Sequence, residues 1–559
     1  MDFQRYLLIG AIAVLSFMLL TEWTHFQQQR ADAPIAAEQT APAQSIVPSP
    51  DNAAANADIP PSGDAAANAP SATSTPTAAS QKRSIHVRTD VLDIQIDRQG
   101  GDIVYAALPK FSAKLDTPDA PFVLLEQDAK RTYIAQSGLI GVDSNNGRPL
   151  YHSASNEYQM SADADNLTVT LSLETEQHIA VQKTFTFHRG DYLINIDYHV
   201  ENKSDAPWQG TLYGRLKRDS SADPSVISGG FGISSFLGAA TNKVDPASTK
   251  IDGYHKLPFK DMAEKPLKIQ QQGGWLAFVQ HYFLSAWIPA ADQQNLFATT
   301  TRDGMHLGWF TGAPQTVAPA ASADFSARLY TGPKDQYRLR TISPGLDLSV
   351  DYGFLWWIAQ PLFYFLTKIH RWLHNWGWSI MVLTLGVKIL FFWLNAKAYM
   401  SMAKMRRVQP KLVEIRERYA DDKQKQSQEM MNLYKTEKIN PLGGCLPVVV
   451  QMPVFLSLYW VLLESVELRH APWILWIKDL SAMDPYYVLP LIMGATMFLQ
   501  QKLNPPPPDP MQAKVMQYMP IMFTFFFLWF PAGLVLYYIV NNVLSITQQY
   551  IITKRVVKT

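Results

Sequence analysis

The sequence predicts a polytopic α-helical membrane protein that also carries one large all-β domain. Three observations predict this class. Apolar runs of membrane-spanning length crowd the C-terminal third of the 559 residues. Residues 84–349 instead place apolar side chains at every second position, which is the period of a β-strand. A segment dominated by Ala, Pro, Ser and Thr separates this β-patterned region from an apolar run near the N-terminus.

Composition limits the kinds of partner and chemistry to be expected. The 49 basic residues balance 48 acidic ones, so the overall charge does not suggest a nucleic-acid binder. One cysteine, Cys445, excludes intramolecular disulfides and a cysteine-based zinc site. We find no nucleotide-binding glycine loop and, in the β-patterned region, no nucleophile elbow or HExxH pattern. We therefore expect no enzymatic activity, no cofactor and no metal site.

The N-terminal run is interpreted as a membrane anchor over residues 3–23. A cleaved signal peptide is the alternative, but no small-residue cleavage pattern follows the run closely. Residues 24–83 contain too few large apolar side chains to offset the entropy cost of ordering, which predicts a disordered tether.

Residues 84–349 predict an antiparallel β-sandwich. Alternation is clear in Leu92-Asp-Ile94-Gln-Ile96, and Gly100-Gly101 supplies a turn. His281 lies in an aromatic run, where a lone histidine is more often structural than catalytic. We expect this domain to bind or to act as a spacer rather than to catalyse.

The first helices after the sandwich predict a membrane region with a buried charge. Residues 352–371 suit an amphipathic helix lying in the membrane interface. Residues 372–395 suit the second transmembrane helix, although Lys388 lies inside it. Because Thr384 and Asn395 share its helical stripe, Lys388 faces either a water-filled cavity or, by snorkelling, the membrane surface.

Residues 396–440 predict a helical hairpin, with Asp421-Asp422 as turn and N-cap. Its excess of Lys and Arg places it in the cytoplasm by the positive-inside rule. The basic residues suggest a docking surface, although a solvated charged face is the simpler reading of the same pattern. The residues of the predicted surface are Lys404, Arg406, Arg407 and Lys411.

Four further transmembrane helices are predicted, which makes six crossings and puts both termini in the cytoplasm. Their ranges are 443–463, 485–501, 515–530 and 534–552, followed by a basic cytoplasmic tail at 553–559. The last helix carries a polar stripe, either as glue between helices or as the wall of a hydrophilic groove. The stripe consists of Tyr538, Asn542, Ser545 and Gln549.

These segments resemble the YidC/Oxa family of membrane protein insertases, in its Gram-negative branch. The resemblance is densest from Tyr352 onward. Sequence strings that carry it include SMAKMR (Ser401–Arg406), NPLGGCLPVVVQMPVFLSLY (Asn440–Tyr459), DPYYVLPLIMGATMF (Asp484–Phe498) and FFFLWFPAGLVLYYIVNN (Phe525–Asn542).

The resemblance implies an inner-membrane insertase and chaperone with a periplasmic β-supersandwich, working alone or with the Sec translocon. Five helices would enclose a groove that is open to the cytoplasm and to lipid and closed toward the periplasm. The residues matching the family's groove are Lys388, Thr384, Gln451 and Tyr538, and the polar stripe adds Asn542. Lys388 departs from the arginine of most relatives, and lysine loses its proton more readily and forms no bidentate fork. Implied partners are nascent membrane proteins, the Sec translocon, membrane lipids, and ribosome or signal-recognition components at the hairpin.

Two other classes of function fit parts of the sequence. A secondary transporter would call for intramembrane carboxylates and repeated halves, and the sequence has neither. A membrane-anchored periplasmic carbohydrate-binding protein would leave the C-terminal helices unexplained.

Overall fold

The computed structural model describes residues 83–143, 147–225, 235–244, 251–437, 446–504 and 510–558. The expected anchor, nearly all of the tether, Gly443, Cys445 and the proline run at 505–508 lie outside the described residues. The chain divides into two units, and the larger, Ala54–Pro505 with Pro520–Thr559, contains every site discussed below.

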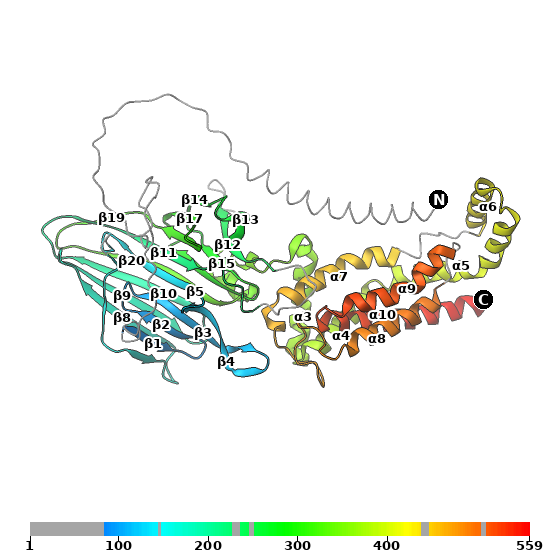
Figure 1. Ribbon diagram of the computed structural model, residues 1–559, viewed down its shortest axis with the longest axis horizontal. Helices are drawn as coiled ribbons and strands as arrows, with labels where there is room; N and C mark the ends of the chain where they lie inside the picture. Colours follow the sequence, from blue (N-terminus) through cyan, green and yellow to red (C-terminus); the bar gives the residue numbers. More distant parts are fainter. Residues whose placement is uncertain are drawn as a thin grey trace, which may run out of the picture. The chain divides into compact units, whose positions relative to one another are not determined.

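The β domain consists of two sheets (Figure 1). The 11-stranded sheet contains β1 (Ser84–Arg88), β2 (Asp93–Asp97), β3 (Asp102–Lys114), β4 (Thr117–Gln127), β5 (Thr132–Ile140), β7 (Glu157–Gln159), β11 (Trp208–Arg218), β14 (Lys268–Gln272), β17 (Gln294–Arg302), β18 (Met305–Thr311) and β19 (Gln315–Val317). The 9-stranded sheet contains β6 (His152–Ser153), β8 (Asn166–Glu174), β9 (Ile179–His188), β10 (Leu193–Asn202), β12 (Gly238–Val244), β13 (Ile251–Pro258), β15 (Leu276–Val279), β16 (Phe283–Pro289) and β20 (Ser322–Pro333). Neighbouring strands are antiparallel except for the β1–β7 pair, so the β-rich domain predicted from the sequence is confirmed.

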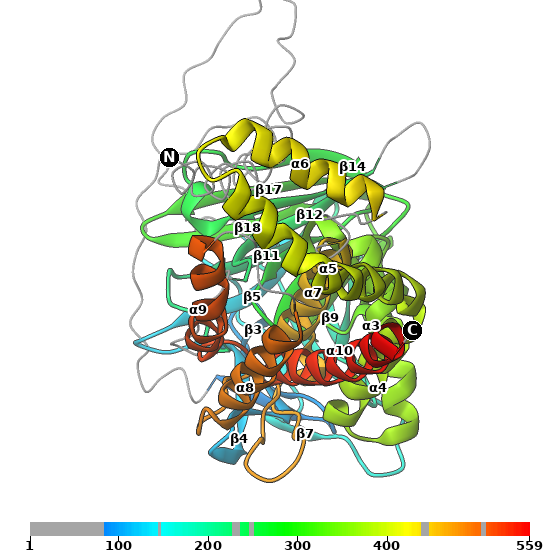
Figure 2. The ribbon, with the colours of Figure 1, turned by 90° about the vertical axis from the view of Figure 1, so that its right-hand side faces the viewer.

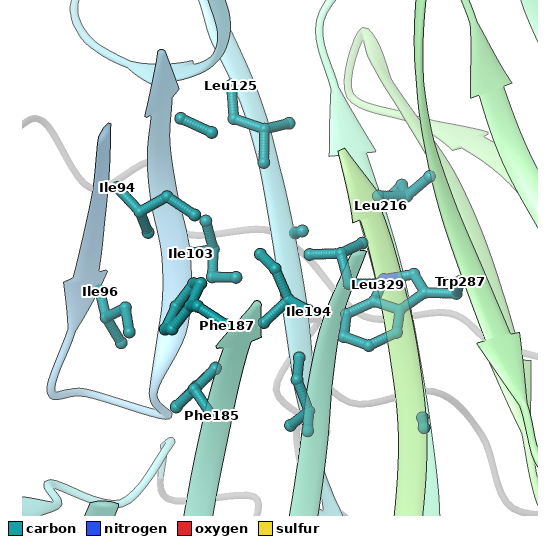
Figure 3. Close-up of a cluster of buried hydrophobic side chains, with 14 of the residues drawn as sticks. Ile94, Ile96, Ile103, Leu125, Phe185, Phe187, Ile194, Leu216, Trp287 and Leu329 are labelled. Carbon is teal, nitrogen blue, oxygen red and sulfur yellow. The ribbon is translucent and has the colours of Figure 1, made fainter. Parts of the chain in front are cut away.

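Strand alternation builds one apolar core between the sheets. In β2 the side chains of Ile94 and Ile96 are fully buried, while the alternating residues Asp93, Gln95 and Asp97 are only partly buried. Figure 3 shows these isoleucines beside Phe185 and Phe187 from β9. Burying each such side chain contributes about 1.5–3 kcal/mol relative to leaving it exposed, so this period-two pattern stabilises the sandwich.

The turn predicted at Gly100-Gly101 needs glycine at both positions. Their φ angles are 78° and 64°, in the left-handed region that other residues rarely adopt. Short helical segments occur within and after the strands. They are η1 (Phe259–Asp261), α2 (Gln336–Ile342), η2 (Leu346–Ser349) and η3 (Gly353–Leu355).

The C-terminal region is helical. Its elements are α3 (Trp356–Leu373), α4 (Trp376–Leu390), α5 (Phe392–Arg418), α6 (Lys423–Thr436), α7 (Leu446–Glu464), η5 (Val466–Leu468), α8 (Val488–Leu503), α9 (Pro510–Phe527) and α10 (Ala532–Lys558). Helix α10 packs against α4, α5, α7 and α8. It is therefore the helix around which polar groups from several others can meet.

The segment expected to form one helix over residues 372–395 is instead broken at Phe391. Helices α4 and α5 meet there at an angle of 67°. No proline causes the bend, and α5 continues without interruption to Arg418 while packing on α10. Within the described residues no single helix is both long and apolar enough to cross a bilayer, whereas this bent pair meets the criteria when taken together.

One other boundary differs from expectation, and one agrees with it. The residues expected as a separate basic tail continue α10 as far as Lys558. At the hairpin, α5 and α6 are separated by residues 419–422, and the Asp422 carboxylate accepts a hydrogen bond from the Lys425 amide at 3.0 Å. Asp422 therefore acts as the N-cap that the sequence predicts.

Candidate functional site

Lys388 lies at a meeting point of three helices. It occupies the last turn of α4 and is 7% exposed. Its ammonium donates hydrogen bonds to Ser545 Oγ of α10 at 2.7 Å and to Gln451 Oε1 of α7 at 3.4 Å. In the part of the chain that the structure describes, no carboxylate forms an ion pair with it. Neutral polar groups therefore hold the cation.

Gln451 extends this cluster along α10. Its amide nitrogen donates to Asn541 Oδ1 and, at 3.5 Å, to the Tyr537 hydroxyl. Tyr537, Asn541 and Ser545 are four residues apart and so occupy one helical face. We call Lys388, Gln451, Tyr537, Asn541 and Ser545 the Lys388 cluster.

The other predicted groove residues lie near the cluster but do not bond to Lys388. Thr384 is 1% exposed, and its hydroxyl donates to the Ile380 carbonyl of its own helix at 2.6 Å. Asn542 donates to Thr496 Oγ1 of α8 at 3.2 Å. The Tyr538 ring packs between Phe455 and Phe527, with both centroid distances 5.2 Å.

Sequence reasoning missed Tyr537 and Asn541, and it noted Ser545 only as part of the stripe. The signal that could have found them is the strict four-residue spacing of 537, 541 and 545. The predicted polar stripe, from Tyr538 to Gln549, mixes residues from two faces of α10. Asn542 donates to Thr496 of α8, and Gln549 donates to Asn504, the residue that follows α8.

One end of the bundle is closed by the chain between α7 and α8. The Asp484 carboxylate accepts hydrogen bonds from the Leu489 amide at 2.7 Å and from the Trp476 indole at 3.0 Å. The Gly533 amide at the start of α10 donates to the Leu480 carbonyl at 2.9 Å. Gly377 of α4 lies so close to the Trp473 ring that an added Cβ would be 2.1 Å from it. Peptide and side chains therefore cover this end.

Comparison with known proteins identifies the family. A family model described as YidC periplasmic domain matches residues 84–365, and one described as 60Kd inner membrane protein matches residues 368–559. The chain belongs to the YidC family of membrane protein insertases. The family predicted from the sequence motifs is thus confirmed.

Relatives named membrane protein insertase YidC match over essentially their full lengths. The protein of Stutzerimonas stutzeri (strain A1501) is 50% identical over 559 residues, covering 100% of this chain and 99% of that one. The protein of Cellvibrio japonicus (strain Ueda107) is 50% identical over 566 residues with the same coverage. The protein of Pseudomonas fluorescens (strain SBW25) is 51% identical over 565 residues, covering 100% and 98%.

These matches favour an insertase over a secondary transporter or an anchored carbohydrate-binding protein. The activity named for the YidC relatives is insertion rather than a chemical reaction, so the expectation that this chain is not an enzyme is confirmed. The transporter and the anchored carbohydrate-binding protein are set aside, because the insertase match extends over both the β domain and the helical region.

The predicted docking residues of the basic hairpin are exposed on its surface. Lys404, Arg406, Arg407 and Lys411 are all exposed. Lys411 forms an ion pair with Glu437 of the chain after α6, at 2.7 Å. The apolar seam between α5 and α6 consists of Val408 and Leu412, against which Met405 and Met430 pack. These two methionines therefore hold the hairpin together, whereas Met400 and Met431 remain exposed.

Proposed function

We propose that this YidC-family membrane protein insertase moves the polar segment of a client protein across the inner membrane at the Lys388 cluster. The observation that carries the proposal is the buried cation Lys388 of α4, bonded to neutral groups of α7 and α10. A charge inside a membrane helix costs about 2.5–3.5 kcal/mol on insertion scales, so its presence in an apolar bundle points to a functional role.

The partners of Lys388 are of a kind that a client can replace. A hydrogen bond from a charged donor to a neutral acceptor contributes about 1.5–3 kcal/mol net. Two opposite charges 4 Å apart attract by about 4 kcal/mol at an effective dielectric of about 20. An acidic residue of the client would therefore displace Ser545 or Gln451 from the ammonium. Hydrophobic partitioning of the client's apolar segment into lipid would then complete insertion without any covalent step.

Entry requires the bundle to open at one particular end. The side chains described here cover Lys388, so α4 and α10 must separate to admit a client. At the opposite end, the Gly533 amide joins the start of α10 to the chain between α7 and α8, and Gly377 of α4 packs against Trp473 of that chain. Opening at the hairpin end is therefore favoured, which supports a groove open to the cytoplasm and closed toward the periplasm.

The proposed topology has six transmembrane helices, both termini in the cytoplasm and the β domain in the periplasm. Basic side chains of α5 and α6 support a cytoplasmic hairpin by the positive-inside rule. The exposed cations Lys404, Arg406 and Arg407 offer a surface for ribosome or signal-recognition components. Cooperation with the Sec translocon belongs to the same proposal.

Charge reversal at Lys388 tests the role of the cation. In cells depleted of their own insertase, Lys388→Glu should lower insertion of a single-span client with an acidic translocated tail by tenfold or more. The reason is that an attraction of about 4 kcal/mol for charges 4 Å apart at an effective dielectric of about 20 becomes a repulsion. Lys388→Arg should insert the client normally.

Matched controls separate this effect from a general loss of charge or of folding. Lys397 is an exposed lysine of α5, so Lys397→Glu makes the same charge change outside the cluster and should leave insertion intact. A client with a neutral tail should be less affected by Lys388→Glu than the acidic one. Normal insertion of the acidic client by Lys388→Glu would refute the proposed role of the cation.

A further inference from the structure

A cavity of about 470 Å³ lies where α5, α8 and α10 meet, away from the Lys388 cluster. The three helices can be followed in Figure 1 and Figure 2. Ala403, Leu503 and the Tyr550 ring supply apolar carbon to its walls, and Arg406, Arg407 and Lys554 supply three positive charges. The volume falls within the range of small-molecule sites, about 300–1,000 Å³.

The three cations of this cavity form no close ion pair with a described carboxylate, although Arg407 interacts at longer range with the Glu437 carboxylate. Within the described ranges, none of Arg406, Arg407 and Lys554 forms an ion pair with a carboxylate. Other cations of the same hairpin do, as Arg418 does with Glu414 at 2.6 Å. The Lys554 ammonium lies over the Tyr550 ring, 5.7 Å from its centroid. An excess of positive charge therefore gathers at the cavity.

The surfaces of α8 and α10 near the cavity are apolar. Phe498 and Leu499 of α8 are 46% and 52% exposed, and Ile551 of α10 is 48% exposed. Lys502 lies 4.8 Å from the Phe498 ring and adds a further cation near the end of α8. Positive charge and exposed hydrocarbon thus occur together on neighbouring turns of the same helices.

We propose that this cavity binds the headgroup of an anionic phospholipid, whose acyl chains run along the apolar surface of α8 and α10. The guanidinium groups of Arg406 and Arg407 suit a phosphate, because their planar donors match its oxygens in pairs. Basic pockets between helices at the cytoplasmic side of a membrane are typical sites for such headgroups. A bound lipid would join α5 to α10 at the base of the hairpin.

The shape of the site favours a lipid over a polyanion. A nucleic acid needs a cationic surface along which its phosphates can lie, and the apolar walls of this cavity offer it nothing. The C-terminal end of α8 carries a partial negative charge of about half a unit, which is smaller than the three full positive charges facing it. An amphiphile with an anionic head satisfies both the charge and the carbon surface.

Lipid binding to the purified full-length chain tests the proposal. We would titrate the protein in non-ionic detergent with dioctanoyl phosphatidylglycerol, dioctanoyl phosphatidylcholine or inorganic phosphate, and count the retained molecules by native mass spectrometry. We expect phosphatidylglycerol to bind at least tenfold more tightly than either of the others. Replacing Arg406, Arg407 and Lys554 by Gln together should weaken its binding by about 100-fold, because each cation near an anionic lipid is worth roughly a factor of five.

A matched variant removes the same charge elsewhere on the hairpin. Replacing Lys404, Lys425 and Lys435 by Gln together should change phosphatidylglycerol binding by less than about threefold, since these residues lie outside the cavity. A second test, Ala403→Trp, fills the cavity while keeping its cations, and should also weaken binding.

Three results would overturn the proposal. Equal weakening by the two triple variants would show that only the total charge matters. Equal binding of phosphatidylglycerol and phosphatidylcholine would show that the cations do not select the headgroup. Phosphate binding as tightly as phosphatidylglycerol would show a simple anion site. The comparison of the three ligands on the unaltered chain decides the last two points even where a variant fails to fold.

Discussion

The buried ion pair between Lys334 and Glu464 offers a sharp test of how the β domain is held to the helical region. Lys334 follows β20, and Glu464 is the last residue of α7, 130 residues further along the chain. Their charged atoms are 2.8 Å apart, and both side chains are 2% exposed. Glu464 also accepts a hydrogen bond from the Ser235 hydroxyl at 2.9 Å.

Neighbouring residues make the same junction more extensive. The His281 ring contacts the Leu463 carbonyl through Nε2 at 2.8 Å, and Val466 is part of the β-domain core. The Arg469 guanidinium lies 5.5 Å from the Phe122 ring centroid. Residues 463–469 thus connect α7 to the sandwich, so exchange of their amides with solvent reports whether the junction opens.

Removing one partner of the pair should loosen this junction strongly. Glu464→Gln leaves the Lys334 ammonium buried without an opposite charge, which costs about 3–5 kcal/mol. Each 1.4 kcal/mol changes the opening equilibrium of the junction tenfold, so the amides of residues 465–469 should exchange with solvent about 100-fold to several thousand-fold faster. Hydrogen exchange followed by mass spectrometry on the full-length protein measures this rate directly.

Two companion variants make the result interpretable. Replacing both partners, Lys334→Met with Glu464→Leu, should restore most of the protection, because an apolar pair of similar volume is often neutral or stabilising. Glu414→Gln breaks an ion pair whose two side chains are both 64% exposed, and should leave residues 465–469 unaffected. Less than threefold faster exchange in Glu464→Gln would refute the view that the pair holds the junction.

Three further perturbations have expected outcomes. Burial lowers the pKa of Lys183, in the β-domain core, to about 7. Between pH 7 and 9 the unfolded chain therefore binds more protons than the folded chain, and the free energy of unfolding should rise by up to about 3 kcal/mol over this range. Denaturant unfolding of Lys183→Met should show a flatter dependence on pH. Gly494→Ala would place a Cβ 2.1 Å from Thr524 Oγ1, which should lower the melting temperature through about 1–3 kcal/mol of overpacking, and adding Thr524→Ala should restore it. Asp422→Ala removes the N-cap of α6 and should weaken that helix by about 1 kcal/mol, seen as roughly fivefold faster exchange of its first amides, and an unchanged rate would contradict the cap.

The β domain was predictable because strand alternation and turns depend on residues that are close together in the sequence. Alternation such as Ile94 and Ile96 requires only that one face of a strand be buried, and the Asp422 cap depends on atoms three residues apart. The bend at Phe391 has no such local cause, since no proline precedes it within α4. It depends on how α5 packs against α10, which one sequence does not reveal.

The composition of the Lys388 cluster was only partly predictable for the same reason. Polarity along α10 identified the helix, but its partners depend on which neighbours face each side. Ser545 meets α4 while Asn542 meets α8, although both belong to one predicted stripe. Likewise, nothing in the sequence brings Glu464 to Lys334 across 130 residues, because such pairing is fixed by the tertiary fold.

Two of the buried lysines, Lys334 and Lys388, show how the partner of a charge decides what the charge can do. Lys334 faces a carboxylate at 2.8 Å, and separating such a buried pair costs several kcal/mol, so the contact is suited to remain closed. Among the described residues Lys388 donates to a hydroxyl and an amide oxygen, and each bond from a charged donor to a neutral acceptor is worth about 1.5–3 kcal/mol. A carboxylate arriving from a client can therefore compete for Lys388 but not for Lys334. Ser545→Asp should therefore supply Lys388 with a permanent acidic partner and impair insertion of an acidic client. Ser545→Ala, which removes only a neutral partner that a client carboxylate would displace, should leave insertion close to normal.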